Sequence, residues 1–237
     1  MTAPHAGYVG TELELFAAAR NWKRYWSDVI APFVGGRVLD VGAGLGATAE
    51  VFAPQAGIAA WTCLEPDARF AAHLATRIAS GGLPGRTRVL HGTTRDLAPT
   101  ERFDTILYID VLEHIRDDRG ELAGAASRLA EGGQLVVLSP AHPFLYAPFD
   151  AAIGHERRYT RATLRAAAPE GLRRVRLDYL DTVGFIASLG NRLVLRSAMP
   201  SAAQIAAWDR LMVPLSRRLD PWLGFRAGKS VLGVWTR

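Results

Sequence analysis

The sequence has little cysteine, little lysine and no long apolar run. Its 237 residues include one cysteine, Cys63, which argues against a disulfide framework and a cysteine-based metal site and favours a reducing compartment. No run of about 18 apolar residues is present, so no membrane-spanning helix is expected. The first residues also lack the basic and apolar regions of a signal peptide, and we therefore expect a cytoplasmic protein.

Charge is divided unevenly along the chain. Residues 1–150 carry 13 Lys and Arg against 17 Asp and Glu, whereas residues 151–237 carry 15 against 6. The basic part favours an anionic partner. Only Lys23 and Lys229 are lysines, so the high isoelectric point reflects arginine usage and is weak evidence for nucleic acid. No nucleic-acid-binding motif is present, and nucleic acid is not expected as a partner.

Short apolar strands alternate with helices over the middle of the chain. This alternation predicts right-handed crossovers and a doubly wound, mostly parallel sheet. Asp67 is expected to cap one of the helices, and Gly132-Gly133 to end another. The expected strands are 37–44, 58–66, 86–92, 102–111 and 134–140, and the expected helices are 45–55, 67–80 and 117–133.

The two ends of the chain have a different pattern. A helix is expected at 11–32, and after Pro140 an irregular loop leads to a short helix from Thr160. A strand at 172–181, an apolar and basic helical stretch at 182–219 and a strand at 229–237 follow. We expect a single domain, 1–237, with a helical cap (1–33), a cofactor-binding core (36–140) and an acceptor-binding and C-terminal part (141–237).

A glycine turn, VGAGLG, follows the first expected strand. Gly42 and Gly44 let the backbone turn tightly and approach a ligand, although their spacing also fits a dinucleotide fingerprint. Glu65, 23 residues after Gly42, suits the ribose hydroxyls of NAD and of S-adenosylmethionine equally. Asp40, two residues before Gly42, repels a pyrophosphate but suits an ammonium and a sulfonium group. The last feature favours S-adenosylmethionine.

The order and spacing of these motifs resemble the class I S-adenosylmethionine-dependent methyltransferases over residues 36–140. Asp110, Glu113 and His114 after the fourth core strand agree with this resemblance. It implies a seven-stranded, Rossmann-like sheet whose last strand is antiparallel, with S-adenosyl-L-methionine as cofactor and S-adenosyl-L-homocysteine as product. The cofactor-binding residues that it implies are Asp40, Gly42, Ala43, Gly44, Glu65, Pro66, Thr93, Thr94, Ile109 and Asp110. Thr93 and Thr94 stand where the family usually has Asp and Ala, so a carboxylate on the adenine amino group is not provided there.

The segment GHERRYT, Gly154 to Thr160, resembles a small-molecule subgroup with a Gly-His-x-Arg-Arg-Tyr run after the fifth strand. That subgroup acts in glycan, lipid-linked sugar and natural-product pathways. We therefore expect methyl transfer to a hydroxyl, amino or carbon nucleophile of a natural product, a sugar or a lipid-linked glycan intermediate.

The loop after Pro140 begins at the edge of the sheet where ligands bind, so we expect it to form the acceptor site. His155 is the candidate general base, and His142 is a second catalytic candidate. One of two adjacent arginines is expected to hold an acidic acceptor, and the other to pair with Asp150 or Glu156. The predicted acceptor-binding residues of this loop are Tyr146, Arg158 and Tyr159.

The N-terminal helix is expected to form a lid over the cofactor, with Asn21 and Trp22 contacting the substrate and Tyr8 and Tyr25 as further polar tips. The stretch 182–219 is interpreted as a pocket wall, with a dimer interface or a membrane-surface contact as alternatives. A monomer and a homodimer both remain open.

No metal is expected, because Asp110 is better explained by the cofactor and the Asp-rich signature of catechol-type enzymes is absent. Two alternative functions remain. One is another Rossmann-like nucleotide enzyme, such as an NAD-dependent reductase or a polyamine synthase. The other is a non-catalytic protein with the methyltransferase fold, and the intact glycines with Asp40 and Glu65 argue against it.

Overall fold

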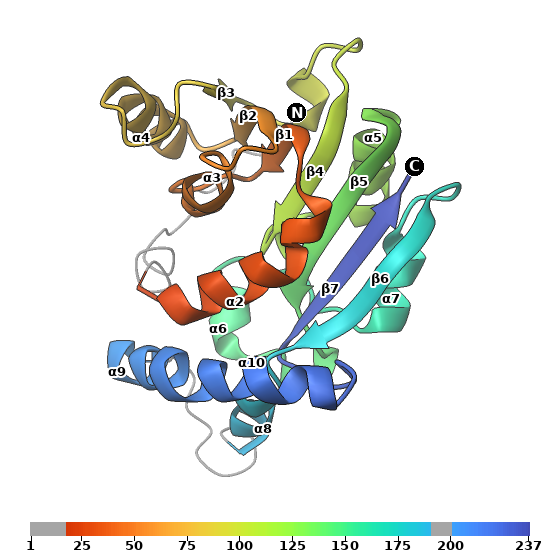
Figure 1. The fold of residues 1–237 in the computed structure, drawn as a ribbon. Helices are drawn as coiled ribbons and strands as arrows, with labels where there is room; N and C mark the ends of the chain where they lie inside the picture. Colours follow the sequence, from red (N-terminus) through yellow and green to blue (C-terminus); the bar gives the residue numbers. More distant parts are fainter. Residues whose placement is uncertain (1–17, 191–200) are drawn as a thin grey trace.

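The computed structural model describes residues 18–190 and 201–237 (Figure 1). The first part of the expected helix at 11–32, Tyr8 of the predicted lid and residues 191–200 of the expected helical stretch lie outside the described residues. No helix within the described ranges is long and apolar enough to cross a membrane.

In the described part of the chain, one seven-stranded sheet forms the centre, in the order β3-β2-β1-β4-β5-β7-β6. The strands are β1 (Gly36–Val41), β2 (Ile58–Glu65), β3 (Thr87–His91), β4 (Phe103–Ile109), β5 (Leu129–Pro140), β6 (Arg173–Leu180) and β7 (Ser230–Thr236). β7 runs antiparallel to both of its neighbours, β5 and β6, while the pairs among β1 to β5 are parallel. The seven-stranded, mostly parallel, Rossmann-like sheet expected from the sequence is therefore confirmed.

Helices cover both faces of the sheet, because each central strand is apolar on both sides. In β1, Val38 packs with the apolar side chains of α2, α3 and α4, whereas Leu39 packs with those of α5 and α7. Figure 1 shows α2 and α10 in front of the sheet and α5 and α7 behind it. These helices are α2 (Arg20–Ile30), α3 (Ala47–Phe52), α4 (Ala68–Ala79), α5 (Asp118–Ser127), α7 (Arg161–Ala167) and α10 (Val213–Trp222).

The predicted cap of Asp67 is confirmed, and one predicted helix end is wrong. Asp67 accepts from the backbone N–H of Arg69 at the start of α4, and Thr160 accepts from that of Thr163 at the start of α7. In contrast, α5 ends at Ser127, well before the glycine pair at 132–133. Residues 129–133 lie in β5, where the register shifts between Phe103 and Thr105, so the glycines accommodate a strand irregularity instead of ending a helix.

The C-terminal part also contains more structure than the sequence predicted. The loop after β5 includes a 3-10 turn (Pro143–Leu145) and the short helix α6 (Pro148–Ala152). The expected stretch at 182–219 divides into α8 (Thr182–Gly190), α9 (Ala202–Ala207), a π-helical turn (Trp208–Met212) and α10. The π turn lies just before Pro214, which has no N–H for the helical ladder.

The α2 helix is attached to the C-terminal helices by buried polar contacts. The hydroxyl of Tyr25 donates to Asp220 at 2.6 Å, and the backbone N–H of Trp22 donates to Asp209 at 2.9 Å. Both acids are buried, so these bonds are shielded from water. This attachment brings the N-terminal helix and the C-terminal insertion to the same side of the sheet.

Candidate active site

The turn after β1 has a backbone shape that glycine favours. Gly42 has φ 64°, and a Cβ there would lie 2.7 Å from a methyl carbon of Val111. The N–H groups of Gly42 and Ala43 donate to the carbonyl of Leu64, which ties the turn to the end of β2. The chain therefore leaves β1 as a tight, bare backbone loop that a ligand can approach closely.

Glu65 ends β2 beside this turn and is held by two backbone donors. Its carboxylate accepts from the N–H of Gly44 at 2.8 Å and from that of Asp67 at 2.9 Å. Burial raises the pKa of Glu65, and these two N–H groups oppose the shift. Adjacent parallel strands thus place the carboxylate next to the glycine turn, as the spacing of Gly42 and Glu65 suggested.

Asp40 lies behind the turn with an unsatisfied oxygen. Its side chain is buried, and its Oδ2 atom has no hydrogen-bond partner among the described residues. Burial raises the pKa of Asp40 to about 8, while the nearby indole of Trp61 opposes the shift. Because an unpaired buried carboxylate is costly, this position favours a cation close to the turn.

A cleft of about 2060 Å³ opens at the carboxyl ends of β1, β2 and β4. It is long enough to adjoin both the glycine turn and the loop after β5. One end is lined by Gly42, Ala43, Gly44, Glu65, Pro66, Ile109 and Asp110, and the other by Trp22, Tyr146, His155, Arg158, Trp208 and Lys229. Most of the residues predicted from the sequence are therefore brought to one cleft.

Asp110 lies on the floor of this cleft between the two ends. It follows β4 with φ 54°, and its N–H donates to the carbonyl of Leu138 at 2.8 Å. The side chain is exposed in the cleft. Desolvation by the surrounding protein raises its pKa, and the charges of His155 and Lys229 oppose the shift.

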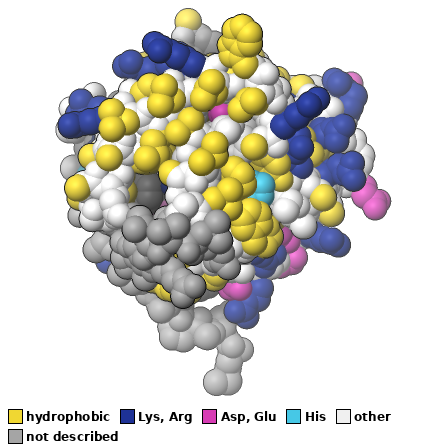
Figure 2. Space-filling model, turned by 90° about the horizontal axis from the view of Figure 1, so that it is seen from below, with side chains coloured by type: hydrophobic (Ala, Val, Ile, Leu, Met, Phe, Trp, Pro, Cys, Tyr) yellow, Lys and Arg dark blue, Asp and Glu magenta, His cyan; other side chains and the backbone are white. Residues whose placement is uncertain are grey.

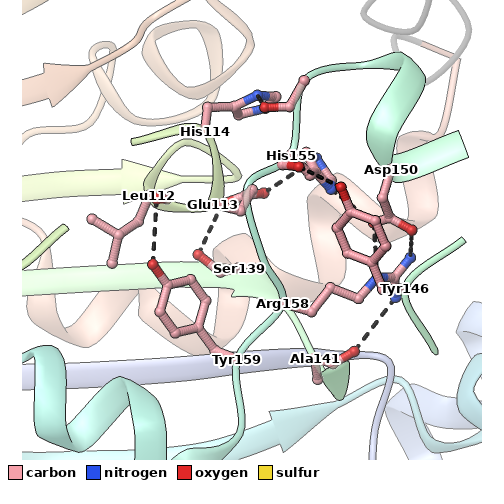
Figure 3. Close-up of polar contacts among 11 residues, drawn as sticks. Leu112, Glu113, His114, Ser139, Ala141, Tyr146, Asp150, His155, Arg158 and Tyr159 are labelled. Atoms are coloured by element: carbon pink, nitrogen blue, oxygen red, sulfur yellow. Dashed lines mark hydrogen bonds and ion pairs between the residues drawn. The ribbon is translucent and has the colours of Figure 1, made fainter. Parts of the chain in front are cut away.

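Asp150 is the centre of a buried ion-pair cluster at the other end (Figure 3). It is 0% exposed, and it accepts two hydrogen bonds from Arg158, at 2.8 and 2.9 Å. Nδ1 of His155 also lies 2.8 Å from its carboxylate. Burial raises the pKa of Asp150, but the bonds from His155 and Arg158 outweigh it and lower the pKa to about 2. The carboxylate therefore fixes both side chains in place.

The imidazole of His155 is held between two carboxylates. Its Nδ1 atom contacts Asp150, and its Nε2 atom lies 3.9 Å from Oε1 of Glu113. The hydroxyl of Tyr146 donates to the backbone carbonyl of His155 at 2.6 Å, which fixes the loop as well. Figure 3 shows the ring pointing toward Glu113. Nε2 is thus the ring atom directed away from Asp150.

Arg158 and Tyr159 point in opposite directions, as adjacent residues of an extended segment do. The Tyr159 ring is 2% exposed, and its hydroxyl donates to Asp118 at 2.7 Å, so the structure does not bring it to the cleft. Arg158, the arginine predicted to bind the acceptor, lines the cleft but pairs with Asp150. Arg157 pairs with Asp118 at 2.8 Å rather than with Glu156. Both arginines therefore have a carboxylate partner within the protein.

Asp40, behind the turn, and four further predicted residues lie outside the lining of the cleft. Nε2 of His142 lies 3.0 Å from the carbonyl of Gly228, and burial lowers the pKa of this histidine. Thr93 bonds Asp96 in a capping box, and the hydroxyl of Thr94 donates to Glu121. Asn21 donates to Asp209 at 3.2 Å. These last four side chains bond to the protein itself.

The cleft also contains residues that the sequence did not single out. Lys229, just before β7, places its Nζ atom 4.6 Å from the ring centroid of Trp208. Burial lowers the pKa of Lys229, and Asp181 and Asp110 oppose the shift. The Trp208 indole donates to the buried Asp181 at 2.7 Å. No local signal marks either residue, because each reaches the cleft from a different part of the C-terminal region.

Comparison with known proteins decides the family. A methyltransferase-domain family model matches residues 16–181, more than half of the chain. The chain belongs to this methyltransferase family. This methyltransferase is 30% identical over 153 residues to demethylmenaquinone methyltransferase of Tropheryma whipplei, strains Twist and TW08/27. The match covers 60% of this chain and 58% of the length of those relatives.

Solved structures support the same fold for this methyltransferase. An S-adenosylmethionine-dependent methyltransferase from Archaeoglobus fulgidus has a TM-score of 0.64 and 16% identity, and covers 98% of this chain and 100% of its own. Coclaurine N-methyltransferase bound to N-methylheliamine and SAH has a TM-score of 0.61 and 15% identity, with 93% and 73% covered. The methyltransferase family and this neighbour imply S-adenosylmethionine as the methyl donor.

Proposed function

We propose that this methyltransferase transfers the methyl group of S-adenosylmethionine to a hydroxyl, amino or carbon nucleophile of a small, apolar or lipid-borne molecule. The observation that carries the proposal is the continuous cleft of about 2060 Å³ between the glycine turn and the loop after β5. Pockets for a single small ligand are usually about 300–1,000 Å³, so this cleft has room for a donor and an acceptor side by side.

The donor end fits the cofactor. The bare turn at Gly42 to Gly44 suits the methionine part, and Glu65 is oriented to accept from the ribose hydroxyls. The unsatisfied oxygen of Asp40 supports a positive charge near the turn. The cofactor supplies the reactive methyl group, which passes in line to the acceptor. We place the Asp110 side chain, on the cleft floor, between the bound donor and the bound acceptor.

The loop after β5 is assigned to the acceptor. Asp150 fixes the ring of His155 so that Nε2 points away from it, which is the arrangement of an oriented general base. We propose that the acceptor's proton is removed at the Nε2 atom of His155. Arg158 acts as a positioning residue, because its guanidinium holds Asp150. Lys229 and Trp208 offer a cation and an aromatic face at the same end.

An apolar surface favours a lipid-borne acceptor over a polar one. Figure 2 shows hydrophobic side chains gathered on the face that contains α8 and α10, with Lys and Arg around them. On α10 and the preceding turn, apolar residues recur at helical spacing and are largely exposed, namely Leu211 (66%), Leu215 (50%), Leu219 (45%) and Trp222 (90%). The name of the curated relatives, which refers to demethylmenaquinone, agrees with an apolar acceptor.

Two measurements test the proposal. Thermal unfolding is followed with S-adenosylhomocysteine and, separately, with NAD; a ligand at 100 times its Kd stabilises by about 2.7 kcal/mol. Stabilisation by NAD alone would replace the methyltransferase assignment with a reductase. The protein is then incubated with labelled cofactor and with lipid and aqueous extracts, and labelled products are identified by mass spectrometry. Label confined to aqueous products would contradict the lipid-borne acceptor.

A further inference from the structure

Three side chains with metal-binding atoms meet on the wall of the cleft, beside Asp110. Glu113 and His114 lie in the 3-10 turn after β4 (Leu112–His114), and His155 lies in the loop after α6. One ligand atom from each lies within 4.8 Å of the others. All three residues line the cleft, and Figure 3 shows the two imidazoles and the carboxylate converging from two separate segments.

One oxygen of Glu113 is buried and unsatisfied. The residue is 0% exposed, its Oε2 accepts from Ser139 at 3.0 Å, and its Oε1 has no hydrogen-bond partner among the described residues. Oε1 is also the atom that faces Nε2 of His155, at 3.9 Å. A buried carboxylate oxygen without a donor is costly, and a cation between Oε1 and Nε2 would relieve that cost.

Both imidazoles are oriented by contacts of their Nδ1 atoms. Nδ1 of His155 lies 2.8 Å from Asp150, and Nδ1 of His114 lies 3.3 Å from the carbonyl of Gly154. Ligating histidines in proteins usually donate their second ring nitrogen to a carboxylate or carbonyl in this way, which fixes the tautomer and directs the other nitrogen to the metal. Ser139 orients the carboxylate of Glu113 in the same manner.

The two segments are held together without a metal. The backbone N–H of Glu156 donates to the carbonyl of Glu113 at 2.8 Å, and the His114 and His155 rings have centroids 4.7 Å apart. Donors bound to one zinc ion are about 3.4 Å apart, given bonds of about 2.1 Å, so binding requires only a small contraction of the three side chains. The site is therefore nearly formed by the fold itself.

We propose that Glu113, His114 and His155 bind a divalent transition-metal ion of the zinc type. Two imidazoles and a carboxylate suit such an ion better than Mg²⁺, which prefers oxygen ligands, and three protein ligands leave a coordination position for another group. That position adjoins the cleft. Metal binding does not depend on the proposed function, but a catalytic use of the metal does. A hydroxyl acceptor bound to the ion would release its proton to water as its oxygen takes the methyl group, and Nε2 of His155 would serve as ligand instead of base.

The test uses the whole protein after dialysis against EDTA, titrated with Zn²⁺ by calorimetry. We expect one site per chain, at least 100-fold weaker in His155→Ala and in Glu113→Gln, and unchanged in His73→Ala, an exposed histidine of α4. With Co²⁺ we expect visible absorption typical of nitrogen ligands in a four- or five-coordinate site. Ser139→Ala, which leaves all three ligands in place, is expected to weaken Zn²⁺ about tenfold.

Two results would overturn the metal site. One is no Zn²⁺ binding tighter than about 1 mM by the folded wild-type protein, and the other is equal affinity in the ligand variants and in His73→Ala. Circular dichroism confirms that each variant is folded, and His155→Gln replaces His155→Ala if the latter is not. S-adenosylhomocysteine binding is measured on the same EDTA-treated protein: its loss would count against the proposed function, and its retention without Zn²⁺ binding would count only against the metal.

Discussion

The two ends of the cleft are built in different ways. The donor end consists mainly of backbone groups on adjacent strands: the bare turn at Gly42 and the N–H groups that hold Glu65. The acceptor end consists of side chains that hold one another, with Asp150 fixing Arg158 and His155. The donor end therefore derives its shape from the main chain, whereas the acceptor end depends on a few buried charges and is the more easily broken by single substitutions.

The largest expected effect is at the acceptor end. Asp150→Ala leaves the guanidinium of Arg158 without its carboxylate in a buried place, so we expect a loss of about 3–5 kcal/mol in the free energy of unfolding. Glu156→Ala is the matched control, because the Glu156 side chain forms an exposed pair with Arg116, at 3.4 Å. Its replacement is expected to cost less than about 1 kcal/mol. Urea unfolding measures both. Equal losses in the two variants would show that the buried Asp150 cluster does not stabilise the acceptor end more than a surface ion pair does.

The next effect concerns the donor end and leaves the fold intact. Glu65→Gln removes the charge that we expect to accept from the ribose hydroxyls. We predict a loss of about 1.5–3 kcal/mol in S-adenosylhomocysteine binding, which is roughly 10- to 150-fold in Kd. Calorimetry with Glu131→Gln, an exposed glutamate in β5, as the control checks this. Unchanged affinity in Glu65→Gln would mean that the backbone of the turn alone binds the cofactor.

A third prediction uses the pKa of Asp40. Its folded-state value of about 8 lies above the ordinary value of 3.8, so the folded protein without ligand keeps a proton that the unfolded chain releases. Relative to Asp40→Asn, stability should be greatest below about pH 4 and should fall as the pH rises through 8. A cofactor with ammonium and sulfonium charges favours the ionised carboxylate, so binding near pH 7 should release a proton. Calorimetry in two buffers of different ionisation enthalpy measures that proton, and Asp40→Asn should not release it.

The smallest expected effect is at the exposed apolar face of α10. Trp222 is 90% exposed and lies on the same side of the helix as Leu215 and Leu219. If this face contacts a membrane surface, Trp222→Ala should weaken sedimentation with phosphatidylglycerol vesicles by about 1 kcal/mol, roughly fivefold. Arg165→Ala, on α7, serves as the control. If the wild-type protein does not sediment with the vesicles, the apolar face does not bind a membrane surface. It would then contact the acceptor or a second copy of the chain.

The donor end was predictable because its residues are contiguous in the sequence. Asp40, Gly42 and Gly44 fall within five residues, and Glu65 ends the next strand, which pairs directly with β1. The order of the sheet followed from the alternation of strands and helices. The end of α5 was not predictable, since a glycine pair ends a helix or bends a strand equally well, and only the pairing of Leu129 with Phe103 decides between them.

The acceptor end was only partly predictable, because its contacts join distant residues. His155 and Asp150 lie five residues apart, and the sequence placed both in the same loop. His155 and Glu113 lie 42 residues apart in the sequence, and Lys229 lies just before the last strand, so no local pattern marks either contact. Arg158 and Tyr159 were both assigned to the acceptor, yet an extended backbone sends neighbouring side chains to opposite sides.

The place of β7 between β5 and β6 has a consequence for synthesis on the ribosome. β6 leaves the ribosome about 50 residues before β7, and among the described strands its only partner is β7. Until β7 is made, the edge of β5 and the whole of β6 therefore present unpaired backbone groups, which favour association with other chains. The nascent chain can form the β1 to β5 part of the sheet early. β7 can pair with β5 and β6, and Lys229 can reach the cleft, only after β7 has been synthesised.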